Sequence, residues 1–283
     1  MIQLIAMDMD GTLLTPPPVH ISAPTLDVLR AASDRGIHLA LASGRLPEDA
    51  GSFAAQASLD MAVIALNGSC MALHPLHSLV HLHHLQNETA TILMKRFLHL
   101  GLTFGLFSGE DLYIHDEDPT HPSPAMMWGT YLPSEHIFRK EAEGWRLVSN
   151  GVSKFVVVDR RACGMLTEMR EEILERFPYL SVTSSWMDNL EINPEHVDKG
   201  SSLPPLADEM DIPMEHVMAI GDNSNDLPML LCSGLSVAMG NATADVLENC
   251  TFRTLDHTQD GVASAIAHLV LGIPRKGVVR LRP

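Results

Sequence analysis

The sequence predicts an α/β protein, with a Rossmann-like parallel sheet core, helices on both of its faces and an inserted α+β cap domain. Near both ends of the chain, short apolar segments alternate with segments of helical spacing, which is typical of parallel strands joined by helices. In the middle, apolar segments adjoin one another, which indicates an α+β arrangement. Four apolar segments of the outer parts end at polar clusters, and ligands bind at that edge of an open parallel sheet.

The first part of the chain contains three predicted strands separated by two predicted helices. The strands are short and apolar and stop at polar or glycine-containing turns. The first helix ends at Gly36, a residue type that commonly follows a helix C-terminus. The predicted strands are 2–7, 37–42 and 61–66, and the predicted helices are 23–35 and 47–57.

The middle of the chain is predicted to form the inserted domain, after which strand–helix alternation resumes. The predicted elements of the insert are helices at 88–100 and 166–177 and strands at 102–107, 112–115, 155–159, 182–185 and 189–192. The later elements are helices at 203–210, 226–233 and 260–271 and strands at 216–220 and 235–238. We therefore expect a core formed by residues 1–82 and 190–283, and a cap formed by residues 83–189.

The composition is that of a globular protein with a strongly negative charge. The 283 residues are 46% hydrophobic and 19% charged, and the formal net charge at pH 7 is −16. This charge repels polyanions, so nucleic acid and anionic membrane surfaces are not expected partners. The four cysteines form no CxxC pair, the N-terminus lacks the basic start of a signal peptide, and no apolar run reaches the roughly 20 residues that span a bilayer. We expect a cytoplasmic protein that is a monomer or a weak homodimer.

The first predicted strand runs into Asp8-Met9-Asp10-Gly11-Thr12, which places two carboxylates two residues apart. Side chains at this spacing on a strand point the same way, and a hard cation such as Mg²⁺, which binds oxygen ligands, relieves their repulsion. Asp222 ends another predicted strand and is a candidate for a further carboxylate ligand. Taken alone, Asp8 and Asp10 are also consistent with an ordinary turn in which Asp side chains bond the local backbone.

Three further polar segments suit phosphate binding. Ser43-Gly44-Arg45 precedes a predicted helix, where N–H groups and a hydroxyl bind phosphate, although an N-cap Ser beside a surface Arg is the commoner pattern. Lys199 precedes another predicted helix and is a suitable point charge for a phosphoryl oxygen, although most lysines are simply solvated. The segment 221–226 carries more oxygen-bearing side chains than a capped helix start requires.

In this order, the segments resemble the four motifs of the haloacid dehalogenase-like (HAD) superfamily, and the resemblance covers essentially the whole chain. Residues 8–12 resemble the first motif, 43–45 the second, Lys199 the third and 221–226 the fourth. The cap inserted after Asn67-Gly68 resembles that of the Cof-type branch with a C2 (IIB) cap, which contains sugar-phosphate and metabolite phosphatases. One departure is Val197-Asp198-Lys199-Gly200, since Val-Ser-Lys-Gly is more usual, but the lysine and the glycine remain.

The resemblance implies a role for each matching residue. It implies that Asp8 is a nucleophile that forms an aspartyl-phosphate, that Asp10 is the general acid and base, and that Mg²⁺ is held by Asp8, Asp222 and the backbone carbonyl of Asp10. The implied phosphate-binding residues are Met9 (through its N–H), Ser43, Gly44, Lys199 and Asn225. The implied supporting residues are Thr12, Arg45, Asn67 and Asp226, the last of which orients Lys199 or a water on the metal.

The implied function is Mg²⁺-dependent hydrolysis of small phosphorylated metabolites, such as sugar phosphates or phosphorylated cofactors like pyridoxal phosphate. Asp10 favours hydrolysis, because ATPases of the family carry Thr at that position and their aspartyl-phosphate persists. A phosphomutase, which retains both aspartates, and a non-catalytic phospholigand sensor remain alternatives, whereas a nucleic-acid-directed phosphatase is disfavoured by the net charge. The fold does not determine the substrate, because cap residues select it.

Overall fold

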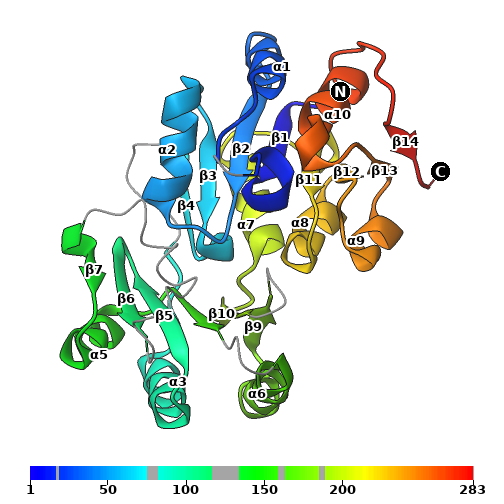
Figure 1. Cartoon of the computed structure of the whole chain (residues 1–283). Helices are drawn as coiled ribbons and strands as arrows, with labels where there is room; N and C mark the ends of the chain where they lie inside the picture. Colours follow the sequence, from blue (N-terminus) through cyan, green and yellow to red (C-terminus); the bar gives the residue numbers. More distant parts are fainter. Residues whose placement is uncertain (17–18, 75–81, 117–133, 159–162, 185–188, 283) are drawn as a thin grey trace. The chain divides into compact units, whose positions relative to one another are not determined.

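The computed structural model describes residues 1–16, 19–74, 82–116, 134–158, 163–184 and 189–282 (Figure 1). The chain divides into two compact units, which we call the core unit and the inserted unit. The core unit comprises Met1–Val80 and Asp198–Pro283, and the inserted unit comprises His81–Val197. Both ends of the chain therefore build one unit and the middle of the chain builds the other.

The core unit contains an eight-stranded sheet in the order β14-β13-β12-β11-β1-β2-β3-β4. Strands from β13 to β3 in this order are parallel, and the edge strands β14 and β4 are antiparallel to their neighbours. The bounds are β1 Leu4–Asp8, β2 His38–Ala42, β3 Ala62–Ala65, β4 Cys70–Ala72, β11 Val217–Gly221, β12 Leu235–Ala238, β13 Phe252–Arg253 and β14 Val279–Arg280. The predicted parallel α/β core is confirmed, whereas the short strands β4, β13 and β14 were not predicted.

Helices cover both faces of this sheet. Helices α7 (Lys199–Asp208), α8 (Leu227–Cys232) and α9 (Ala244–Asn249) pack with strand residues in one buried apolar cluster. Helices α1 (Ala23–Ser33) and α10 (Gly261–Leu269) contact each other and contribute no residue to that cluster, so they lie on the opposite face. Helix α2 (Pro47–Ala57) packs against β3 and β4.

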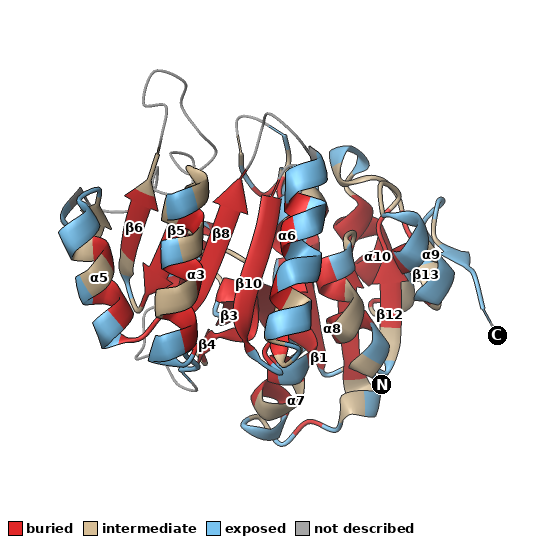
Figure 2. Ribbon diagram, turned by 90° about the horizontal axis from the view of Figure 1, so that it is seen from below, coloured by how far each residue is buried: buried red, intermediate tan, exposed pale blue. Residues whose placement is uncertain are grey.

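The inserted unit contains a six-stranded sheet in the order β7-β6-β5-β8-β10-β9, with one face covered by helices. Pairing is antiparallel except between β6 and β7, as an α+β insert requires. Figure 2 shows the buried strands β8 and β10 between helices α3 and α6, whose outward faces carry exposed residues. The bounds are α3 Asn87–Leu100, β5 Thr103–Ser108, β6 Asp111–His115, β7 Ile137–Phe138, α5 Glu141–Asn150, β8 Lys154–Val158, α6 Cys163–Arg176, β9 Leu180–Thr183 and β10 Asn189–Glu195.

The second boundary between the units differs from the one expected from sequence, which separated cap from core after residue 189. Strand β10 continues to Glu195 and pairs with both β8 and β9, so these residues belong to the inserted unit, which ends at Val197. The apolar pattern stops at Ile192, but the strand continues through Pro194 because a β-bulge between Asn193 and Glu195 accommodates it. Among the described residues, no helix combines the length and hydropathy needed to cross a membrane.

Candidate functional site

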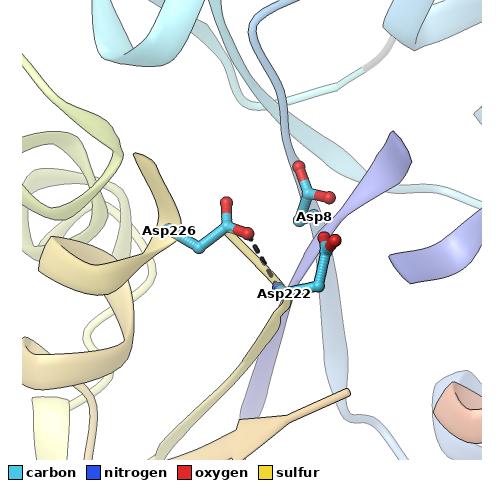
Figure 3. Close-up of side chains that lie close together, drawn as sticks. All are labelled: Asp8, Asp222 and Asp226. Carbon is cyan, nitrogen blue, oxygen red and sulfur yellow. Dashed lines mark hydrogen bonds between the residues drawn. The ribbon is translucent and has the colours of Figure 1, made fainter. Parts of the chain in front are cut away.

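Three carboxylates gather at the C-terminal ends of β1 and β11, which are neighbours in the core sheet. Asp8 is the last residue of β1, Asp222 directly follows β11, and Asp226 ends the short helical turn that comes next. One oxygen of each carboxylate lies within 4.8 Å of one oxygen of each of the others (Figure 3). The structure therefore brings together residues that are far apart in the sequence.

Lys199 points into this cluster from the first turn of α7. Its Nζ lies 2.5 Å from Oδ1 of Asp8 and 2.5 Å from Oδ1 of Asp226, and its side chain is fully buried. The helix begins here because Asp198 is its N-cap and forms a reciprocal capping box with Ser201. The lysine at position 199 thus reaches the carboxylates from a rigid helix N-terminus.

Close packing of α7 against α8 requires the glycine that follows the lysine. A Cβ added to Gly200 would lie 2.4 Å from the backbone carbon of Pro228, so any other residue would push the two helices apart. On its other side, α7 approaches the turn after β3, where Ser202 Oγ donates to the carbonyl of Gly68 at 2.9 Å. These contacts place Lys199 between the segments that follow β3 and β11.

Asp226 differs from the other two carboxylates because its oxygens already have donors. Its Oδ1 accepts from Lys199, and its Oδ2 accepts from the backbone N–H of Asp222 at 2.9 Å and of Asn223 at 3.1 Å. The dashed line in Figure 3 marks the first of these two backbone bonds. Asp226 is therefore arranged to hold Lys199 and the turn, whereas Asp8 and Asp222 are the better placed carboxylates for a metal.

The electrostatics of the cluster favour a cation. Burial raises the pKa of Asp8 well above its usual range, with repulsion from Asp226 adding to the effect and Lys199 opposing it. Burial and Asp226 also raise the pKa of Asp222 to about 6. Burial alone would favour a neutral Lys199 amine, but Asp226 and Asp8 outweigh it and raise the lysine pKa, so the group is an ammonium. One ammonium faces three carboxylates, and an all-oxygen donor set with surplus negative charge suits Mg²⁺.

Neighbouring side chains hold the Asp222 carboxylate against the turn Met9–Leu13 that follows β1. Thr12 Oγ1 donates to Asp222 Oδ1 at 3.0 Å, and Asn241 Nδ2 lies 3.3 Å from Oδ2. Gly11 has φ of 82°, and a Cβ there would lie 2.5 Å from Oδ2 of Asp222, so the close approach requires glycine. Asn241 was not predicted, although it directly follows the strand β12 and Met239-Gly240, as the other polar clusters follow their strands.

Asp10 does not join the buried cluster in this structure. Its carboxylate forms a bidentate ion pair with Arg45, with Nε to Oδ2 at 2.7 Å and Nη2 to Oδ1 at 2.6 Å. The Asp10 side chain is 44% exposed, in contrast to Asp8. Arg45 also donates through Nη1 to Asp49 Oδ2 at 2.9 Å, and Asp49 is a buried residue that was not predicted. The signal for it is the spacing of four residues from Arg45 at the start of α2.

The remaining predicted residues lie at the same sheet edge. Ser43 directly follows β2, whose Ala42 is paired with Asp8, and Ser43 Oγ accepts the backbone N–H of Arg45 at 3.1 Å. Asn67 donates its N–H to the Ser43 carbonyl at 2.9 Å, and Gly44 lies between Ser43 and Arg45. The predicted residues that are buried in the turns after β1 and β11 are Met9, Thr12 and Asn225.

Comparison with known sequences gives the same family over nearly the whole chain. A family model described as haloacid dehalogenase-like hydrolase matches residues 5–266. The 5-amino-6-(5-phospho-D-ribitylamino)uracil phosphatase YcsE of Bacillus subtilis is 29% identical over 273 residues, which cover 95% of this chain and 96% of that protein. The pyridoxal phosphate phosphatase YbhA of Escherichia coli is 28% identical over 273 residues, which cover 95% of this chain and 99% of that protein.

Solved structures share the fold of both units. A haloacid dehalogenase-like hydrolase from Bacteroides thetaiotaomicron has a TM-score of 0.81 at 26% identity, covering 95% of this chain and 100% of that chain. A HAD subclass IIB sugar phosphatase has a TM-score of 0.79 at 19% identity, covering 94% of this chain and 98% of that chain, and at this identity the likeness concerns the fold alone.

Proposed function

The chain belongs to the haloacid dehalogenase-like hydrolases, and we propose that this phosphatase hydrolyses small phosphorylated metabolites with Mg²⁺ through an aspartyl-phosphate on Asp8. The observation that carries the proposal is the contact between Lys199 and Asp8, with the Asp222 carboxylate beside them. A buried carboxylate that faces both an ammonium and a cation-binding carboxylate can approach a phosphoryl group, whose charge would otherwise repel it.

Asp8 is the proposed nucleophile. One of its carboxylate oxygens forms a bond to phosphorus while the bond from phosphorus to the leaving-group oxygen breaks, and water then cleaves the aspartyl-phosphate to inorganic phosphate. Lys199 holds the ammonium charge near the transferring group, and Asp226 keeps that ammonium in place. Bound Mg²⁺, held by Asp8, Asp222 and the backbone carbonyl of Asp10, would offset negative charge on the phosphoryl oxygens.

Asp10 is the proposed general acid and base. It gives a proton to the leaving-group oxygen in the first step and takes one from the attacking water in the second. Both of its oxygens are bound to Arg45 in this structure, so the carboxylate must exchange that partner for the reacting groups. The 44% exposure of the Asp10 side chain leaves its carboxylate accessible to a new partner, and Arg45 keeps its bond to Asp49 when Asp10 leaves.

The proposed phosphate-binding groups come from three turns at one edge of the sheet. Ser43 and Gly44 follow β2, Met9 offers its N–H after β1, and Asn225 belongs to the turn after β11. Lys199 completes the set from the start of α7. Thr12, Arg45 and Asn67 are proposed to support this arrangement, because each contacts one of the site segments.

The proposed substrates are small phosphate monoesters, such as sugar phosphates or phosphorylated cofactors. Two relatives, named above, are phosphatases of pyridoxal phosphate and of a phosphoribityl uracil, and both match along almost their full length. The net charge of −16 supports a small-molecule substrate over nucleic acid.

Phosphate release from a panel of phosphorylated metabolites, with and without Mg²⁺, tests the proposal. The wild-type protein is expected to release phosphate from at least one compound only with Mg²⁺, and Asp8→Asn is expected to release none. Asp27→Asn, which changes an exposed carboxylate on α1, is the matched control and should keep full activity. No release from any compound, including p-nitrophenyl phosphate, would overturn the proposal. Transfer of phosphate within a sugar without net release would identify a phosphomutase, and ligand binding unchanged in Asp8→Asn without turnover would identify a sensor.

A further inference from the structure

We propose that Asn241 is a positioning residue that aligns the Asp222 carboxylate for Mg²⁺. The inference rests on the magnesium site of the proposed function and concerns a residue outside the four motifs that predicted the site. Asn241 lies in the turn after β12, and its side chain reaches the segments that follow β1 and β11.

Hydrogen bonds fix which way the Asn241 amide faces. Its Oδ1 accepts the backbone N–H of His257 at 3.1 Å, so its Nδ2 must face the opposite side. There Nδ2 donates to the carbonyl of Gly11 at 2.8 Å and lies 3.3 Å from Oδ2 of Asp222, and both of these groups are acceptors. A side chain that both accepts and donates in this geometry is required, and asparagine supplies both functions.

The backbone around Asn241 is held as firmly as its side chain. The N–H of Gly240 donates to the Leu255 carbonyl at 2.9 Å, and a Cβ on Gly240 would lie 2.5 Å from the Asp256 nitrogen. On the other side, the N–H of Thr243 donates to the Asp222 carbonyl at 2.9 Å. Backbone hydrogen bonds therefore hold the turn that contains Asn241 to the segment before α10 on one side and to the start of the turn after β11 on the other.

The hydrogen bonds of Asn241 restrict two groups at the proposed metal site at once. Asp222 accepts from Thr12 through one oxygen and lies near Asn241 through the other, so its carboxylate has a fixed rotation. The Gly11 carbonyl held by Asn241 follows directly after Asp10, whose own carbonyl is a proposed ligand. Removing Asn241 leaves the Asp222 carboxylate held by Thr12 at one oxygen only, so its rotation is less restricted and metal binding must then order it.

Isothermal titration of Mg²⁺ into metal-free protein tests this inference without turnover. For Asn241→Ala we expect the Mg²⁺ dissociation constant to rise by about tenfold or more, the range found when groups that orient metal ligands are removed. Asn249→Ala is the matched control, because Asn249 also donates its Nδ2 to a backbone carbonyl, at 2.7 Å, but contacts Asp245 on α9 rather than the site. The control should bind Mg²⁺ as the wild type does.

A second variant and a kinetic measurement separate positioning from a purely structural role. Asn241→Leu keeps the branching and the number of heavy atoms of the side chain while removing both polar functions, and it should weaken Mg²⁺ binding as the alanine variant does. With substrate, both variants should need more Mg²⁺ for half-maximal rate yet approach the wild-type kcat at saturating Mg²⁺. Circular dichroism melting of the metal-free proteins establishes that each variant is folded.

The outcomes distinguish this inference from the proposed function. Folded variants that bind Mg²⁺ as tightly as the wild type would overturn the role of Asn241 while the phosphatase proposal stands. Weakened Mg²⁺ binding in a protein that releases phosphate from no compound would support the role of Asn241 and overturn the phosphatase proposal. A wild-type protein that binds no Mg²⁺ would overturn the inference itself.

Discussion

Asp8 and Asp10 are two residues apart, yet the structure holds their carboxylates in opposite ways. Asp8 is buried and bonded to Lys199, which comes from a rigid helix start and is itself fully buried. Asp10 is 44% exposed and bonded to Arg45, a long side chain on the loop before α2. The Asp8 carboxylate is fixed within a buried cluster, whereas the Asp10 carboxylate lies partly exposed at the edge of that cluster.

The difference agrees with what the two groups are proposed to do. A nucleophile must keep one position, and a buried ion pair with further hydrogen bonds provides this. A general acid and base must change partners twice in each turnover, which the partly exposed Asp10 carboxylate can do more readily than the buried Asp8 carboxylate. The contrast between the two ion pairs therefore predicts that substitutions in the buried pair lower both kcat and the free energy of unfolding, whereas substitution of Asp10 mainly lowers kcat.

Replacing the buried lysine should have the largest effect. Lys199→Met leaves two buried carboxylates without their ammonium, so we expect kcat to fall by about 10²–10³-fold or more, together with a loss of about 3–5 kcal/mol in the free energy of unfolding. Steady-state kinetics and urea unfolding measure the two losses. Lys276→Met, at an exposed position in the C-terminal segment, is the control that should change neither. A Lys199→Met protein with wild-type kcat would contradict the placement of this charge in the reaction.

Replacing Asp10 should reduce turnover without a comparable loss of stability. For Asp10→Asn we expect kcat to fall by about 10²–10⁴-fold, because the proton donor and acceptor is lost. The free energy of unfolding should fall by less than in Lys199→Met, because Asp10 is 44% exposed and Arg45 keeps Asp49 as a partner. Mass spectrometry after acid quenching tests the assignment further, since an aspartyl-phosphate that forms but is not hydrolysed adds one phosphate to the chain. A stability loss as large as that of Lys199→Met would remove the contrast between the two pairs.

The convergence of Asp8 and Asp222 could be predicted because the alternating pattern indicates a parallel sheet, whose strands end at one edge, whereas the place of Lys199 beside them was expected from the family resemblance. Parallel strands β1 and β11 are neighbours and end at the same edge, so residues that end them must meet. Asn241 and Asp49 have weaker signals, which are the position of Asn241 after β12 and the four-residue spacing of Asp49 from Arg45. Neither signal identifies the partner, because the bonds from Asn241 to Gly11 and from Arg45 to Asp10 join segments that are far apart in the sequence.

Two features of the inserted unit, helix α5 and the extension of strand β10, were also not predicted from the sequence. Helix α5 contains Gly144, which weakens a helical pattern, but a Cβ there would lie 2.6 Å from the end of Met94, so the glycine permits close packing. Strand β10 extends past its apolar residues through Pro194, which a bulge accommodates. In both cases tertiary packing overrides the local preference, and local preference is what the sequence pattern reports.

The pH dependence of Mg²⁺ binding also tests the buried cluster, with a smaller expected effect than the two substitutions above. Burial and Asp226 raise the pKa of Asp222 from 3.8 to about 6 in the folded protein. The metal-free fold thus holds this proton more tightly than the unfolded chain, so the group favours folding at low pH and this contribution is lost as pH rises from about 4 through about 6.

Mg²⁺ requires the ionised carboxylate, so its effect has the opposite sign. We expect the rise in melting temperature caused by a fixed Mg²⁺ concentration to grow between pH 5 and pH 7. Thermal melts with and without Mg²⁺ at each pH measure this. Asp222→Asn should show little Mg²⁺ effect at any pH. A wild-type Mg²⁺ effect that is equally large at pH 5 would contradict the raised pKa of Asp222.

Asp49 should have the smallest effect, because it acts on Asp10 only through Arg45. Burial raises the pKa of Asp49, Arg45 opposes the rise, and Oδ1 of Asp49 is buried without a hydrogen-bond partner among the described residues. The raised pKa means that the fold stabilises the Asp49 charge little, so Asp49→Asn should lower the free energy of unfolding by less than Lys199→Met does. The kcat should still fall, by less than about tenfold, because a less firmly held Arg45 aligns Asp10 less well. Glu48→Gln, at the exposed neighbouring position, is the control. A loss of stability with unchanged kcat would show that Asp49 stabilises only the start of α2. The ion pair between Asp10 and Arg45 would then act independently of Asp49.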